Sequence, residues 1–338
     1  MGRAISSFVL LVLVASASFA ADAPRWWLFE ERDYFDPLIA GVREPQISAL
    51  ALARADRMAF MIRKKSPRQV WDIDLGAEMP IFGRESRASI DERMPPGGTG
   101  WGIWIPIDFH MIEDFVDNSA PIVNTDYRFS VMFKAQHGLA DDRWIALRLQ
   151  LGHESTHLGD EFSIRASQHF AATFERINVS WQYLDVSGMY EHGGEKWFTS
   201  IRGGATARVL PFRASYYETD IDSITLSPSP VTPSKNWLDP YAGFEGTREE
   251  WIPGHGHPGW DGYVSTELRY RSIYDYHKAN PNSAEHRQLS VNVIAGIKKT
   301  GGGRASPFVR YYHGVNPHGQ FRNQKNYKEY GIGVRFVL

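Results

Sequence analysis

The chain has 338 residues, no cysteine, 37 basic and 39 acidic residues and a formal net charge of −2. These values exclude a disulfide-stapled scaffold, a Cys-rich zinc module and a strongly basic nucleic-acid binder, so we expect no nucleic-acid partner. Aromatic residues make up 13% of the chain, which excludes a disordered protein. The mean hydropathy of −0.36 excludes a bundle of transmembrane helices but fits a membrane barrel with half-polar strands.

The first twenty residues predict a secretory signal peptide that is cut after Ala20. Arg3 precedes an apolar run over 8–14, and small residues stand before the cleavage point. An uncleaved anchor is the alternative, but the run is short for a bilayer and polar residues follow at once. We therefore expect export, with residues 21–45 as a periplasmic N-terminal segment and 46–338 as the folded part.

Apolar and polar residues then alternate in steps of two, the period of a strand with two different faces. The clearest segments are 69–81, 101–111, 127–135, 145–151 and 177–183. Others cover 46–62, 196–209, 213–225, 260–276, 287–299, 306–314 and 327–338, which makes about twelve strands. In every clear segment the odd-numbered residues form the apolar row, including Trp181 and Tyr183.

The strands predict a membrane barrel rather than a soluble sandwich, which would also alternate. They are about ten residues or longer, and their polar faces carry charges of both signs, as a hydrated lumen tolerates. The alternation continues to Leu338, where a soluble fold would expose a long apolar edge. We expect an all-β, transmembrane, antiparallel up-and-down barrel of about 12 strands in the outer membrane of a Gram-negative bacterium. The last strand would be recognised by the insertion machinery.

With both chain ends in the periplasm, most long connections fall on the cell surface and the short ones in the periplasm, as such barrels prefer. The predicted surface connections are 112–123, 158–172, 277–286 and 315–326, and the short ones are 137–142 and 300–305. Two long stretches, 83–99 and 226–258, come out periplasmic. Either the strand count is off there or these stretches are folded inserts.

The segment Gly152–Glu161 contains His153-Glu154-Ser155-Thr156-His157, which reads as H-E-x-x-H. On a helix this spacing places two imidazoles one turn apart for zinc, with the glutamate as general base. The residues before it alternate as a strand, and Gly152 and Gly159 leave no room for a useful helix. The zinc interpretation is therefore disfavoured, and no metal or other cofactor is expected here.

On a strand, His153, Ser155 and His157 continue the apolar, lipid-facing row of 145–151. Ionisable groups on that face are costly and therefore point to function. A hairpin through 158–172 would bring Glu175 beside them. His153 as base, Ser155 as nucleophile and Glu175 as the group orienting the imidazole would form a serine hydrolase, with phospholipid or lipid A esters as natural substrates.

This pattern resembles two outer-membrane esterase families, outer-membrane phospholipase A and lipid A 3-O-deacylase. In both, a His and a Ser two residues apart are followed on the next strand by Asn or Glu. The resemblance implies the roles just given to His153, Ser155 and Glu175. This chain departs from the pattern at Thr156, where the families have Asn, and in its longer spacing to Glu175; the oxyanion donors are unaccounted for.

A broader resemblance is to a bacterial outer-membrane family catalogued as domain of unknown function 1207. The matching stretches are Phe35-Asp36-Pro37-Leu38-Ile39-Ala40, Arg43-Glu44-Pro45-Gln46 and Ser155-Thr156-His157-Leu158-Gly159-Asp160-Glu161. This resemblance implies a barrel and carries no activity with it.

A non-enzymatic structural or transport barrel remains open as the alternative. His153, Ser155 and His157 would then reach lipid headgroups, and Asp160 and Glu161 would start a surface loop or share a cation such as calcium with lipopolysaccharide phosphates. The expected inward charges would brace a narrow lumen or line a selective channel. They are Asp72, Asp74, Glu78, Arg128, Lys134, Arg148 and Arg176. His255 and His257 could bind a metal, although a Gly/Pro loop favours solvated side chains.

Overall fold

The computed structural model describes residues 25–30, 34–35, 37–55, 70–86, 94–114, 122–159, 176–208, 215–220, 223–230, 238–254, 258–272, 287–300, 305–319 and 325–336. The predicted signal peptide, Asp160, Glu161, Glu175, His255 and His257 lie outside these residues. Throughout the described ranges, no helix is long and apolar enough to cross a membrane.

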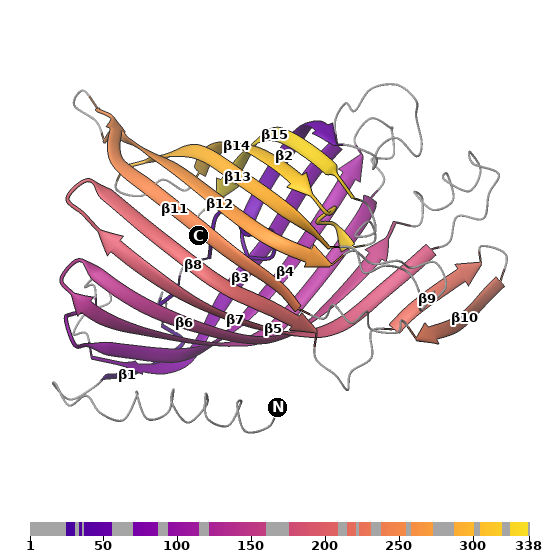
Figure 1. The fold of residues 1–338 in the computed structure, drawn as a ribbon, viewed down its shortest axis with the longest axis horizontal. Helices are drawn as coiled ribbons and strands as arrows, with labels where there is room; N and C mark the ends of the chain where they lie inside the picture. The colour runs from indigo at the N-terminus through magenta and orange to yellow at the C-terminus, as the bar shows by residue number, and fades with distance from the viewer. Residues whose placement is uncertain are drawn as a thin grey trace.

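Twelve antiparallel strands form a closed barrel, which confirms the predicted fold (Figure 1). The wall runs in order around the barrel, and β15 pairs back with β2 to close it. Its strands are β2 (Ile47–Ala55), β3 (Val70–Glu85), β4 (Thr99–Asp114), β5 (Ile122–Ala140), β6 (Arg143–Leu158), β7 (Arg176–Gly193), β8 (Trp197–Arg208), β11 (Leu238–Ile252), β12 (Trp260–Ser272), β13 (Arg287–Lys299), β14 (Ala305–Gly314) and β15 (Tyr327–Phe336).

The three other strands lie outside this wall. β1 (Arg25–Leu28) pairs with the last four residues of β3. The hairpin of β9 (Ser215–Asp220) and β10 (Ser223–Pro230) pairs with the first residues of β7 and extends beyond the barrel (Figure 1). The predicted wall strand over 213–225 was therefore wrong, because its described residues, 215–220 and 223–225, belong to the hairpin.

β11 takes that place in the wall, although its residues fell inside the predicted connection 226–258. Its outward row includes Pro240 and Gly246, which have little or no β-propensity and obscure the alternation in the sequence. β8 ends and β11 begins at the same end of the barrel, from which the chain also leaves the wall for the other long connections. We call this end the long-loop end. The opposite end, which we call the short-turn end, contains the turn at 141–142. The long connection 86–98 between β3 and β4 also belongs to this end, as predicted for 83–99.

Apolar side chains face outward on the strands of the wall, as a lipid-facing surface requires. The predicted odd-numbered outward rows of β3 to β6 are confirmed. Exposed members of these rows include Leu75, Met79, Ile107, Phe109, Tyr127, Phe129, Val131, Ile145, Leu149 and Leu151. The wall is thus apolar outside and polar inside, which is the arrangement of a transmembrane barrel.

β7 reverses the predicted row. Trp181 and Tyr183 face inward and are buried, whereas Gln182 and Leu184 face outward. Gly152 on β6 explains this phase: a Cβ atom there would lie 2.5 Å from the Tyr183 ring, so the glycine makes room for that ring inside the barrel. Large aromatic side chains that fill a lumen look, in sequence, like those that face lipid.

Residues 37–46, the inner segment, run through the interior of the barrel rather than outside it. The Ala40 amide donates to Ser265 Oγ on β12 at 3.0 Å, and Asn292 Nδ2 on β13 donates to the Ala40 carbonyl at 2.6 Å. On the other side of the lumen, Arg128 Nη2 on β5 donates to the Val42 carbonyl at 3.4 Å. The segment therefore contacts opposite walls and fills the space between them.

Aromatic packing closes the short-turn end beside the inner segment. Trp27 Nε1 donates to the Tyr34 hydroxyl at 2.9 Å, and that hydroxyl donates to Glu85 Oε2 at 2.8 Å. Trp144 Nε1 donates to the Met94 carbonyl at 2.8 Å, which fixes part of the 86–98 connection against β6. The buried cluster is Trp27, Tyr34, Met94, Trp104, Met132 and Trp144.

Candidate functional site

The outward polar residues of β6 form the first candidate site. Ser155 Oγ lies 2.9 Å from His157 Nε2, a hydrogen-bonding distance for a nucleophile and its base. His153 Nδ1 instead lies 3.2 Å from Gln182 Nε2 on β7. The structure therefore pairs Ser155 with His157, two residues after it, whereas we had expected His153 as the base.

Aromatic side chains border this outward patch. The Tyr127 ring on β5 meets the His157 ring edge to face, with centroids 5.5 Å apart. Phe129, on the same strand, is about half exposed and lies in register with His153. A dyad set in an apolar, aromatic surface near the long-loop end could receive an acyl chain from the bilayer.

The third predicted member, Glu175, lies outside the described residues, as do Asp160 and Glu161. Its placement rested on an outward odd-numbered row in β7, and this basis was wrong because Trp181 and Tyr183 face inward. Within the described part of the chain, His157 contacts no carboxylate.

The H-E-x-x-H interpretation of 153–157 is excluded by the strand. Glu154 faces the lumen, fully buried, while His153 and His157 face outward. Glu154 Oε2 lies 3.7 Å from Arg43 Nη2 of the inner segment. A glutamate on the opposite face of the wall cannot act as general base at an ion held by these two imidazoles, so Glu154 serves the lumen instead.

The lumen contains the second candidate site, centred on Glu44 of the inner segment. Its carboxylate lies between Arg148 Nη1 on β6, at 2.5 Å, and Arg202 Nη1 on β8, at 3.0 Å. Both guanidinium groups also stack over the Phe35 ring, 4.9 and 4.3 Å from its centroid. Phe35, two residues before the inner segment, and Glu44 within it thus both contact this wall.

The charge state of Glu44 follows from this clasp. Burial on its own would raise the pKa of Glu44, but the positive charges of Arg148 and Arg202 outweigh that effect and lower the pKa to about 2. Glu44 is therefore ionised at neutral pH, and its charge is balanced within the protein.

The charged network continues along the wall from Arg148. Arg148 Nη2 pairs with Asp185 Oδ1 at 3.1 Å, and Asp185 also accepts from the Tyr241 hydroxyl at 2.8 Å and from Thr206 Oγ1 at 2.7 Å. Lys134 pairs with Glu78. The predicted inward charges, except Arg176, whose side chain is not described, are thus confirmed as a mixed-charge network. Sequence reasoning missed Glu44, because it assigned residues 21–45 to the periplasm.

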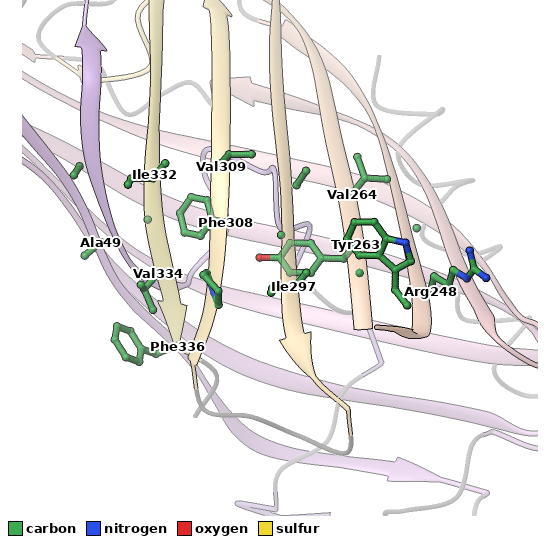
Figure 2. Close-up of a pocket in the computed structure, with 18 of the residues that line it drawn as sticks. Ala49, Arg248, Tyr263, Val264, Ile297, Phe308, Val309, Ile332, Val334 and Phe336 are labelled. Carbon is green, nitrogen blue, oxygen red and sulfur yellow. The ribbon is translucent and has the colours of Figure 1, made fainter. Parts of the chain in front are cut away.

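An apolar hollow of about 1100 Å³ lies along another part of the wall, from β11 to β15 and β2. Figure 2 shows Phe308, Val309, Ile332 and Val334 on adjacent strands around it. Small residues such as Ala49 leave this stretch of the wall recessed. In a membrane the hollow would be filled by lipid chains, and it does not include Ser155 or Glu44.

Comparisons with known proteins give likeness to solved structures at low sequence identity. No family model matches the chain, and no curated protein matches it either. The resemblance to the family of unknown function 1207 therefore stays an expectation.

Two of the similar solved structures are autotransporter domains. The translocator domain of autotransporter NalP from Neisseria meningitidis is 10% identical, with a TM-score of 0.39, over 100% of this chain and 96% of that one. The β domain of the Bordetella autotransporter BrkA is also 10% identical, with a TM-score of 0.35, over 87% of this chain and 99% of that one. Likeness at this level transfers no function.

Proposed function

We propose that this chain is an outer-membrane barrel whose pore is closed by its own inner segment, and that it works as a gated transport barrel rather than as an open channel or an enzyme. The observation that carries the proposal is the clasp of Glu44 by Arg148 and Arg202 inside the lumen. The apolar outer surface and the signal peptide expected from residues 1–20 support the location.

The polar contacts of the inner segment support a gate. Beside the apolar packing of Ile39 and Ala40, they include hydrogen bonds to the wall from the Ala40 amide to Ser265 and from Gln46 Nε2 to Asp74 Oδ2 at 3.3 Å. Water can replace such contacts at lower cost than it can replace an apolar interface. β1 and β2 hold the two ends of the segment to β3, so it could leave the lumen only as a tethered loop.

Conductance across planar bilayers tests this proposal. The intact protein should show little steady current, and deletion of residues 37–44 should open a pore of stable conductance. A large steady current through the intact protein would overturn the closure. A deletion variant that folds and stays closed would overturn the gate and leave a structural barrel.

A lipid acyl hydrolase is the second candidate, favoured by the 2.9 Å contact between Ser155 Oγ and His157 Nε2. Ser155 Oγ would attack an ester carbonyl carbon while its proton passes to His157 Nε2. That proton would then go to the leaving alkoxide oxygen, giving an acyl-serine and an alcohol, and water would release the fatty acid by the same route. The position near the long-loop end favours lipids of the outer leaflet.

Turnover in mixed micelles containing phospholipid or lipid A tests the second candidate. If the intact protein hydrolyses either lipid, Ser155→Ala and His157→Ala should each lower the rate by about 10²- to 10⁴-fold. His153→Ala is the matched control and should lower it less, because His153 contacts Gln182. No turnover by the intact protein, or equal turnover by Ser155→Ala, excludes the hydrolase.

A further inference from the structure

We infer that Asp72, His110 and His318 form a binding site for one divalent transition-metal ion, such as zinc, inside the barrel near its long-loop end. Each residue offers one ligand atom, and the three atoms lie within 4.8 Å of one another. All three side chains are buried. They come from β3, β4 and residues 315–319, which fold back into the lumen after β14. The site does not depend on the proposed gate.

His318 provides the strongest indication of a missing partner. Its Nε2 lies 3.4 Å from Glu329 Oε2, whereas its buried Nδ1 has no hydrogen-bond partner. A neutral imidazole that donates from Nε2 to a carboxylate leaves the Nδ1 lone pair free to bind an ion. This arrangement, in which a carboxylate fixes the tautomer and the orientation of a metal-binding histidine, is common around protein metals.

The charges around the two histidines also favour a cation. Five buried carboxylates surround them and face two guanidinium groups, Arg128 and Arg310. The carboxylates are Asp72, Asp74, Asp108, Asp126 and Glu329. With neutral imidazoles, carboxylates outnumber the positively charged groups in this cluster, and one divalent ion would offset that imbalance. Protonation of both imidazoles would reduce it equally, but the buried Nδ1–H of His318 would then have no acceptor.

The geometry needs only a small adjustment to bind an ion. His110 Nε2 lies 2.5 Å from Asp72 Oδ1, and the His110 and His318 rings are 4.8 Å apart between centroids. Two ligands on a tetrahedral zinc ion stand about 3.4 Å apart, so shifts of about 1 Å would complete the site. Two imidazoles and one carboxylate favour zinc, cobalt or nickel over calcium and magnesium, which prefer oxygen ligands.

Bound metal would fasten residues 315–319 to the wall. Gly319 already donates its amide to Asp126 Oδ2 at 2.9 Å, and the Tyr312 hydroxyl donates to the Val315 carbonyl. An ion that links His318 to β3 and β4 would cross-link this segment to two strands far from it in sequence. The lumen would then be held closed near the long-loop end as well as by Glu44.

Zinc binding to the purified full-length barrel, with no histidine tag, tests this inference. His255→Ala and His257→Ala form the background, because these two histidines could bind metal separately. After chelator treatment, the protein should bind one Zn²⁺ per chain by mass spectrometry of eluted metal, and its Tm should rise. Co²⁺ should bind with the visible absorption of tetrahedral coordination, whereas Ca²⁺ should bind at least tenfold more weakly.

Three variants should weaken Zn²⁺ binding at least tenfold: His110→Ala, His318→Gln and Asp72→Asn. Glu329→Gln should weaken it by about 10- to 100-fold, because Glu329 orients His318. His192→Ala is the matched control: His192 also pairs with an aspartate, Asp142, at 3.0 Å, but it lies at the exposed short-turn end. Heat-dependent gel migration confirms that each variant is a folded barrel. Unchanged Zn²⁺ binding in folded His318→Gln, or no Zn²⁺ bound by the background protein, overturns the site.

Discussion

The polar residues on the two faces of β6 differ in burial and in their number of hydrogen-bond partners. On the inner face, Arg148 and Gln150 are buried, and each has two or more hydrogen-bond partners. On the outer face, Ser155 and His157 are only partly buried and contact mainly one another. Inward polar groups of β6 therefore depend on hydrogen-bond partners within the protein. Outward polar groups near the end of the strand can form hydrogen bonds with lipid headgroups or water.

This difference assigns different roles to the two faces. A buried charge without a partner is costly, so the inner residues are fixed by pairing and hold the lumen closed. The outer residues near the long-loop end bear no such constraint, and a nucleophile there stays accessible. In the proposed function, closure would depend on the inner face, and any lipid chemistry would belong to the outer face.

The largest effect is expected from Glu44→Ala. Removing this carboxylate leaves Arg148 and Arg202 buried without their shared partner, which should weaken docking of the inner segment by about 3 to 5 kcal/mol. Planar-bilayer recordings should then show frequent opening. Glu249→Ala, at an exposed position of β11, is the control and should stay closed. A closed Glu44→Ala barrel would contradict the role of the clasp.

Leu151→Arg tests the other face of β6. Leu151 is exposed in the middle of the strand, and a charge at the bilayer midplane should destabilise the barrel by about 2 to 4 kcal/mol. Leu139→Arg, near the short turn, should cost about 0 to 1 kcal/mol. Reversible unfolding in phospholipid vesicles measures both. Equal effects would mean that this row does not face the membrane core.

The neighbouring pair Glu154→Gln and Ser155→Ala gives the sharpest comparison. Glu154→Gln weakens the contact with Arg43 in the lumen and should lower the free energy of unfolding by about 1 to 3 kcal/mol. Ser155→Ala, one residue later and facing outward, should change it by less than about 0.5 kcal/mol. A larger effect for Ser155→Ala would show that the outer polar patch is structural.

The smallest effect is expected from pH. Because the pKa of Glu44 is lowered to about 2, its contribution to docking is complete above the ordinary glutamate pKa and is lost only as the pH falls toward 2. Protease cleavage within residues 37–46 should thus stay constant between pH 8 and about pH 5. Marked cleavage or channel opening already at pH 6 would place control of the segment elsewhere.

Much of the barrel could be predicted from the sequence, and the failures have physical causes. The period-two pattern is strong where one face is purely apolar, so β3 to β6 were placed with the correct phase. It fails at β11, where Pro240 and Gly246 stand in the outward row, and at β7, where Trp181 and Tyr183 fill the lumen. An alternating sequence pattern shows that a strand has two different faces, but it does not show which face points into the lumen.

The sequence by itself determined that the chain is rich in amphipathic strands, that charges of both signs line one face, and that Ser155 and two histidines share the other face. Only the tertiary structure decided which of these groups meet. Glu44 reaches Arg148 and Arg202, and His318 reaches Asp72 and His110, across large separations in sequence. Such contacts depend on the closure and register of the barrel, and local pattern carries no information about either.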